Sequence, residues 1–113
     1  MLPMWSESDS GQSLLDIELG TTPHKDPMKY WKHSPIAYAN KVTTPTLLIQ
    51  GNQDIRCPVT QADELFYALQ HFGCQAELIH LENCNHGGQL RGRTALRRYR
   101  MSVMRGWFDQ HIQ

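Results

Sequence analysis

The sequence has few of the features that would place it in a specialised class of proteins. It contains three cysteines in 113 residues, and their irregular spacing argues against a disulfide framework. No apolar run is long enough to span a membrane. The segment Met1–Ser13 lacks the basic start and apolar core of a signal peptide. We therefore expect a cytoplasmic protein with no membrane partner.

An excess of charge of one sign is also absent. Eleven Lys and Arg residues balance eleven Asp and Glu residues, so the formal net charge at pH 7 is zero. This balance gives no reason to expect a nucleic-acid partner. The basic residues are nevertheless uneven, because several arginines lie in the last quarter of the chain: Arg91, Arg93, Arg97, Arg98, Arg100 and Arg105. The favoured interpretation is a solvated helix face, and a phosphate or nucleic-acid patch is the alternative.

Metal-binding and cofactor-binding motifs are missing as well. Cys84-x-His86 would form half of a metal site, but no CxxC or second ligand pair accompanies it. Cys57 lies close enough to Asp54 in the sequence to suggest a nucleophile, although a small side chain packed under a loop is the favoured interpretation. We expect neither a metal nor a cofactor.

The pattern of apolar and helix-capping residues divides the chain into a weakly patterned segment and a segment with predictable helices and strands. Residues 1–25 are poorly patterned and are interpreted as a loop or frayed terminus with one short helical turn ending at Gly20. Asp26-Pro27 predicts the start of a helix over about 27–33, because Asp can accept backbone N–H bonds and Pro fits the first helical position.

Two apolar runs, at about 46–50 and 75–81, predict parallel strands of an α/β protein. The first run is apolar on successive residues, which indicates burial on both faces of a sheet. Residues 60–72 between the runs carry apolar side chains at helical spacing, with Thr60 or Pro58 as the predicted start. This order predicts a right-handed βαβ unit, followed by a loop over 82–92 and a last helix over about 94–112.

The two predicted strands bring an acid and a histidine to one edge of the sheet. Asp54 follows the first strand and Gly51, and His86 follows the second strand. Functional groups gather beyond the carboxyl ends of parallel strands. An Asp can orient an imidazole, which can then act as a general base toward a hydroxyl group. The alternatives are a turn or helix-cap role for Asp54 and an ordinary loop position for His86.

Several motifs together strengthen the first interpretation. They are Ser34-Pro35-Ile36-Ala37-Tyr38, the stretch from Thr44 to Gly51 with Asp54 and Pro58, Gln61-Ala62 with the stretch from Leu65 to Leu69, Asn85-His86-Gly87, and Trp107-Phe108. Combined, they resemble the C-terminal end of the catalytic domain in the prolyl oligopeptidase family of serine peptidases, nearest to its acylaminoacyl-peptidase and dipeptidyl-peptidase-like branch.

The resemblance implies a partial α/β-hydrolase fold over residues 26–113. It implies that Asp54 is the acid and His86 the base of a catalytic triad, and that the complete enzyme cleaves short peptides through a seryl ester. Two positions depart from the family pattern, because Gln50 replaces a common His and Cys57 replaces a common Val. Neither position belongs to the triad.

A nucleophile is the one triad member that the sequence does not supply. No serine before Asp54 lies in a Gly-x-Ser-x-Gly motif. We therefore expect a C-terminal portion of a hydrolase domain that is inactive alone and whose partner is the missing N-terminal part. Arg91 and Arg93 are weaker candidates for contact with a substrate carboxylate. The alternative is a stand-alone small α/β protein that self-associates through an open sheet edge.

Overall fold

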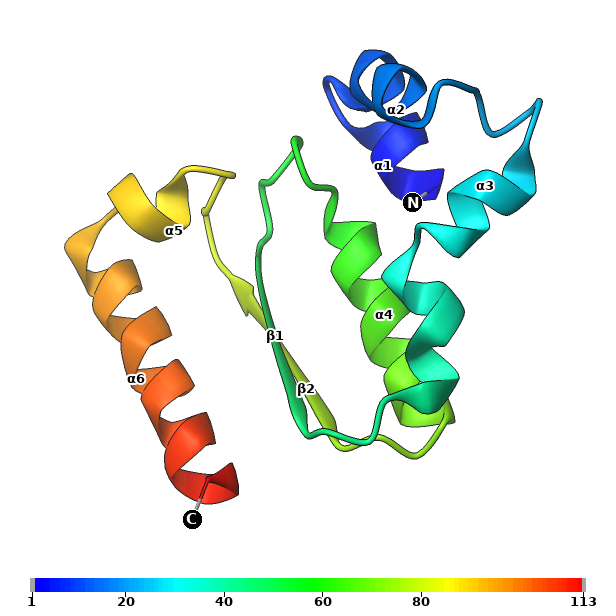
Figure 1. Cartoon of the computed structure of the whole chain (residues 1–113). Coiled ribbons are helices and arrows are strands. Elements are labelled where there is room, and N and C mark those ends of the chain that lie inside the picture. Colours follow the sequence, from blue (N-terminus) through cyan, green and yellow to red (C-terminus); the bar gives the residue numbers. More distant parts are fainter. Residues whose placement is uncertain (1, 113) are drawn as a thin grey trace.

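The structure, a computed structural model, describes residues 2–112 and consists of a small parallel sheet with helices on both faces (Figure 1). The elements in chain order are α1 (Leu2–Glu7), α2 (Gly11–Leu19), α3 (Pro27–Lys32), the 3-10 helix η1 (Pro35–Lys41), β1 (Thr46–Gly51), α4 (Val59–His71), β2 (Ala76–Leu81), α5 (Gly88–Arg91) and α6 (Thr94–His111). None of the helices in the described residues is both long and apolar enough to cross a membrane.

The sheet is a parallel pair whose register runs from Thr46 opposite Ala76 to Gly51 opposite Leu81. Both strands therefore end at the same edge. In Figure 1, α4 lies on one side of the sheet and α6 on the other. The predicted α/β class, the βαβ unit and the parallel pairing are confirmed, and the architecture matches part of an α/β-hydrolase fold.

Apolar side chains form two separate buried clusters. One joins η1, α4 and the start of β2 through Ala39, Leu69 and Cys74, with Leu48 of β1 packed against it. Helices α4 and η1 pack on one face of β1 and α6 lies on the other, which explains why the strand is apolar on successive residues. The expected burial on both faces is only partly reached, because the strand residues from Thr46 to Gln50 are half-buried. The second cluster, Leu15, Leu19 and Tyr30, holds the N-terminal helices together.

The end of α2 at Gly20 and the start of α3 at Asp26-Pro27 were predicted correctly. The side chain of Asp26 accepts a hydrogen bond from the backbone N–H of Lys29 at 3.0 Å, and Pro27 is the first residue of α3. Gly20 and Gly73 follow α2 and α4 with φ angles of 63° and 78°. Glycine adopts this left-handed conformation without a Cβ clash, which is why both helices stop there.

The prediction of a loop or frayed terminus near the start of the chain is wrong, because α1 and α2 occupy much of residues 2–25. The predicted helical turn ending at Gly20 is confirmed as the end of α2. The indole of Trp5 donates to Asp16 at 2.9 Å, and the hydroxyl of Tyr30 donates to the same carboxylate oxygen at 3.0 Å. Contacts between elements therefore stabilise helices that local propensity does not predict.

Two smaller predictions also need correction. Thr60 does not cap α4, which begins at Val59 after Pro58; its hydroxyl donates instead to Glu7 at 2.7 Å. The expected loop over 82–92 contains the short helix α5.

Candidate functional site

Asp54 lies in the loop between β1 and α4, with its side chain only 2% exposed. One carboxylate oxygen, Oδ1, accepts hydrogen bonds from the backbone N–H groups of Arg56 at 3.0 Å and Cys57 at 2.8 Å. These bonds fix the plane of the carboxylate and leave Oδ2 to face the loop that follows β2. A buried carboxylate held by backbone donors is well suited to keep one orientation.

His86 lies in the loop after β2, and its Nδ1 is 3.1 Å from Oδ2 of Asp54. A carboxylate only accepts hydrogen bonds, so Nδ1 is the donor of this pair. In the neutral ring, Nε2 is then an acceptor. The histidine side chain is 58% exposed, so the pair combines a buried acid with an accessible base. The structure thus brings together the two residues that the sequence placed at this edge.

A close approach between the two loops sets the spacing of the pair. The backbone carbonyl of Cys84 accepts a hydrogen bond from the N–H of Gln53 at 3.0 Å, and the N–H of Asn52 donates to Leu81 at 3.1 Å. A Cβ on Gly51 would collide with the carbonyl group of Cys84. Only glycine therefore allows the loop that carries Asp54 to lie against the loop that carries His86.

Gln50 is a site residue whose role the sequence did not reveal. Its side-chain amide donates to Oδ2 of Asp54 at 3.2 Å and to the carbonyl of Cys57 at 3.0 Å. The amide therefore ties the end of β1 to the far end of the acid loop. Its position as the last side chain of β1 before Gly51 is the signal that would have indicated this contact.

The turn between α1 and α2 also contacts the acid loop. Arg56 makes two hydrogen bonds to the carboxylate of Asp9, at 2.6 and 3.1 Å. The N–H of Asp9 donates to Ile55 at 3.0 Å, and the hydroxyl of Ser8 donates to the carbonyl of Arg56 at 2.7 Å. The hydrogen bond from Arg56 lowers the pKa of the Asp9 carboxyl group. Sequence spacing gave no sign of this contact, because its partners lie far apart in the chain.

An open cavity of about 530 Å³ lies beside the histidine. It is lined by Asp9, Gln53, Ile55, Arg56, Asn85, His86 and Gly87. The cavity gives small molecules or extended chain segments access to the exposed ring of His86 while Asp54 stays covered.

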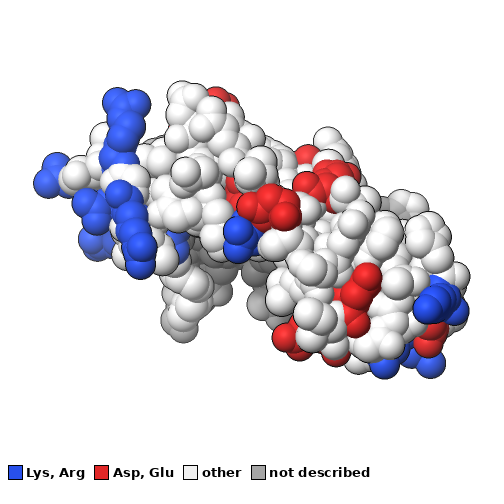
Figure 2. Space-filling view, turned by 90° about the horizontal axis from the view of Figure 1, so that it is seen from above, with Lys and Arg blue, Asp and Glu red and all other residues white. Residues whose placement is uncertain are grey.

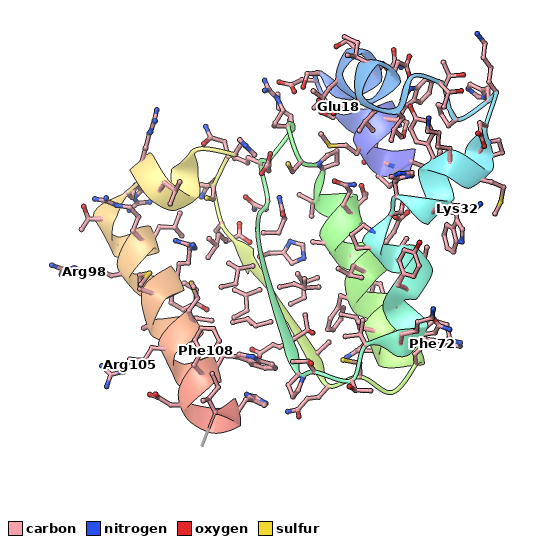
Figure 3. All side chains as sticks on the ribbon, in the orientation of Figure 1. Glu18, Lys32, Phe72, Arg98, Arg105 and Phe108 are labelled. Atoms are coloured by element: carbon pink, nitrogen blue, oxygen red, sulfur yellow. The ribbon has the colours of Figure 1, made fainter. Side chains whose placement is uncertain are left out.

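Arg91 and Arg93 are exposed and do not line this cavity. Arg91 ends α5, and Arg93 precedes α6 beside a different hollow, next to Glu82 and Tyr99. Basic side chains gather over the α5–α6 end of the molecule (Figure 2). Figure 3 shows Arg98 and Arg105 pointing away from the sheet, as expected for a solvated helix face. A substrate contact by Arg91 or Arg93 would require a substrate that extends beyond the cavity.

Cys57 has the properties of a protonated thiol rather than a nucleophile. Its side chain is half-buried, and burial is the main cause of a raised thiol pKa. The negative charge of Asp54 raises this pKa further. One donor atom each from Asp54, Cys57 and His86 nevertheless lies within 4.8 Å of the others.

Comparisons with known proteins show which proteins this chain resembles. The chain is 37% identical over 105 residues to the uncharacterized peptidase YuxL of Bacillus subtilis (strain 168), a match that covers 93% of this chain and 16% of that protein. It is 32% identical over 62 residues to the acylamino-acid-releasing enzyme of Arabidopsis thaliana, covering 55% of this chain and 8% of the enzyme.

Among solved structures, the acylaminoacyl peptidase of Pyrococcus horikoshii superposes with a TM-score of 0.91 at 28% identity, covering 97% of this chain and 18% of the peptidase. The chain thus spans less than a fifth of the length of these relatives. Residues 4–113 match the sequence profile of the prolyl oligopeptidase family. The similarity to peptidases, the shared fold and the match over nearly the whole chain lead to one conclusion: this chain belongs to the prolyl oligopeptidase family.

Proposed function

We propose that the chain supplies the acid and the base of a serine peptidase that cleaves short peptides by acyl transfer. The observation that carries the proposal is the 3.1 Å contact between Oδ2 of buried Asp54 and Nδ1 of exposed His86. Membership in a peptidase family supports it.

In this proposal His86 performs the proton transfers. Its Nε2 takes the proton of a serine hydroxyl as that oxygen attacks the scissile carbonyl carbon, and later donates the proton to the leaving amine. Asp54 holds Nδ1–H in place and stabilises the imidazolium ion that forms between the two steps. The open cavity beside His86 leaves room for the peptide and the nucleophile.

The serine is proposed to come from a segment outside these residues. The 113-residue sequence contains no Gly-x-Ser-x-Gly motif, and the relatives are several times longer than this chain. Without the nucleophile and the oxyanion hole built next to it, the chain alone is expected to be inactive.

A chimeric enzyme tests the roles of the two residues. The chain would replace the matching segment of the Bacillus relative, to which it is 37% identical, and hydrolysis of short peptides with free and acylated N-termini would be measured. We expect His86→Ala or Asp54→Ala to lower kcat by about 10⁴-fold. Arg98→Ala, an exposed change on the outer side of α6, is the matched control and should leave kcat unchanged. A chimera that keeps its activity with His86→Ala would overturn the proposed base.

The isolated chain needs a separate test. It should not react with a fluorophosphonate probe for activated serines. Strong labelling that disappears with His86→Ala would show that the chain contains its own nucleophile.

A second candidate function is self-association of a stand-alone protein. A groove of about 390 Å³ lies between β1 and α6, lined by Pro45, Thr46, Leu47, Ile49, Arg100, Met104, Trp107 and Phe108. Within residues 2–112, β1 pairs with β2 alone, so its other edge has no strand partner. Such an edge can pair with a second chain. Sedimentation over a range of concentrations distinguishes the two candidates, because a monomer at every concentration rules out self-association.

A further inference from the structure

Three different metal-ligating side chains meet at the edge of the sheet. Asp54 and Cys57 come from the loop after β1, and His86 comes from the loop after β2. One donor atom from each lies within 4.8 Å of the other two. Sequence spacing could not reveal this cluster, because it depends on the parallel pairing that brings the two loops together.

The donor types select the class of ion. A thiolate, an imidazole and a carboxylate are the ligands that proteins use for Zn²⁺, whereas Mg²⁺ and Ca²⁺ prefer oxygen ligands alone. Three protein ligands leave a fourth tetrahedral position for water or another group. We propose that Asp54, Cys57 and His86 form a binding site for one Zn²⁺ or a similar thiophilic divalent cation.

The required movements are small. Tetrahedral bonds of about 2.0–2.3 Å place neighbouring donors about 3.3–3.8 Å apart, compared with the limit of 4.8 Å that encloses them in the structure. Oδ1 of Asp54 is held by two backbone N–H groups, whereas Oδ2 contacts the side chains of Gln50 and His86, so Oδ2 is the oxygen available to a cation once the amide of Gln50 turns away. The exposed ring of His86 and the half-buried side chain of Cys57 can move toward it.

Binding is balanced in protons and charge. The thiol of Cys57 loses its proton to solvent and becomes a thiolate. Nδ1 of His86 gives up the proton that now points to Asp54, and Nε2 takes one from solvent, so the ring stays neutral. Two anionic ligands then match the two positive charges of the cation, and no electron is transferred.

A cation at this site would occupy the same atoms that the proposed peptidase chemistry uses. Oδ2 of Asp54 and Nδ1 of His86 cannot hold a metal and their shared proton at the same time. Metal binding and proton transfer therefore exclude each other. This consequence rests on the proposed function, whereas the binding site itself does not.

The test uses the full 113-residue chain, a non-thiol reductant, and Zn²⁺ and Cd²⁺ as probes. Calorimetry with Zn²⁺ should show one tight equivalent, and Cd²⁺ should produce the ultraviolet charge-transfer band of a metal thiolate. Cys57→Ser and His86→Ala should each weaken Zn²⁺ binding by about 100-fold or more, and Cys57→Ser should remove the band. Two matched controls, Cys74→Ser and His33→Ala, change the same residue types away from the cluster and should have no effect.

Several outcomes would overturn the site. They are no binding by the unmodified chain, a band that survives Cys57→Ser, and a band that is lost only with Cys84→Ser. If a variant does not fold, NMR of the unmodified chain decides the question, because Zn²⁺ must shift the ring signals of His86 and leave those of His33 unchanged. None of these readouts measures peptidase activity, so failure here is distinguishable from failure of the proposed function.

Discussion

The carboxylate of Asp54 has two kinds of partner, and each oxygen serves a different one. Oδ1 holds the loop through the N–H groups of Arg56 and Cys57, while Oδ2 faces Gln50 and His86. A single side chain therefore both stabilises the loop and orients the histidine. Its substitution should affect stability as well as chemistry.

We expect Asp54→Ala to lower the free energy of unfolding by about 1–3 kcal/mol, because two partly buried hydrogen bonds from backbone N–H groups lose their acceptor. Asp54→Asn keeps an oxygen at this position and should lower it by less. Urea denaturation of the chain measures both values. Asp109→Ala, at an exposed carboxylate on α6, is the control and should change stability little. Equal effects of Asp54→Ala and Asp109→Ala would show that the N–H contacts do not stabilise the loop.

At the scale of elements, the fit between the two loops depends on one missing Cβ. Gly51→Ala would push a methyl group into the carbonyl group of Cys84, and neither backbone can move without breaking contacts in the sheet edge. We expect a loss of about 1–3 kcal/mol in the free energy of unfolding, together with shifted NMR signals of His86.

Gly106 provides the matched control for this change. It lies inside α6, and nothing lies within 4 Å of a Cβ placed on it. Gly106→Ala should therefore raise the free energy of unfolding by about 0.5–1 kcal/mol, as expected for glycine replaced in a helix. If both substitutions stabilise the chain, the loops do not approach each other as described.

The contact between the α1–α2 turn and the acid loop should depend on pH. Arg56 lowers the pKa of Asp9 in the folded chain relative to the unfolded chain. The stabilisation is therefore present above the unfolded value, about 3.9, and disappears as the pH falls through the lowered folded value. Carbon-13 NMR of the Asp9 carboxyl group should show its pKa rising in Arg56→Gln. Arg98→Gln should leave it unchanged, and an unchanged pKa in both variants would contradict the ion pair.

The elements that were predicted correctly are those whose sequence signals lie within a few neighbouring residues. The succession Leu47, Leu48 and Ile49 predicted the central strand, and the apolar spacing of residues 60–72 predicted α4, whose Leu69 is buried. Parallel strands end at one edge, so the meeting of Asp54 and His86 followed from local patterns.

Contacts made by the N-terminal helices and by Gln50 were the part that could not be predicted. The helix α1 is short and begins with Leu2-Pro3, so its stability depends on partners such as Asp16. The pairing of Asp9 with Arg56 likewise has no signature in local spacing. The sequence shows Gln50 only as a departure from the family pattern outside the triad, because its contacts form only once the acid loop folds back.

For the whole molecule, the groove between β1 and α6 is the apolar surface that bears on association. Phe108 lines it and is 51% exposed. If the groove binds a second copy, Phe108→Glu should weaken self-association about tenfold, or 1.4 kcal/mol, in sedimentation experiments. Ile17→Glu is a suitable control, because Ile17 is 80% exposed on α2, at the other end of the molecule. Equal effects of the two substitutions would place the interface elsewhere.

The backbone hydrogen bond from Gln53 to Cys84 has a further consequence for how an active site could be assembled. It fastens the loop of the acid directly to the loop of the base, so their relative position is set within this chain. The conformational entropy lost on bringing Asp54 and His86 together is therefore part of the folding of this chain, and assembly with another segment does not add to it. A serine on another segment then has to be aligned with one preorganised acid–base unit instead of two independent groups, which makes the alignment less demanding.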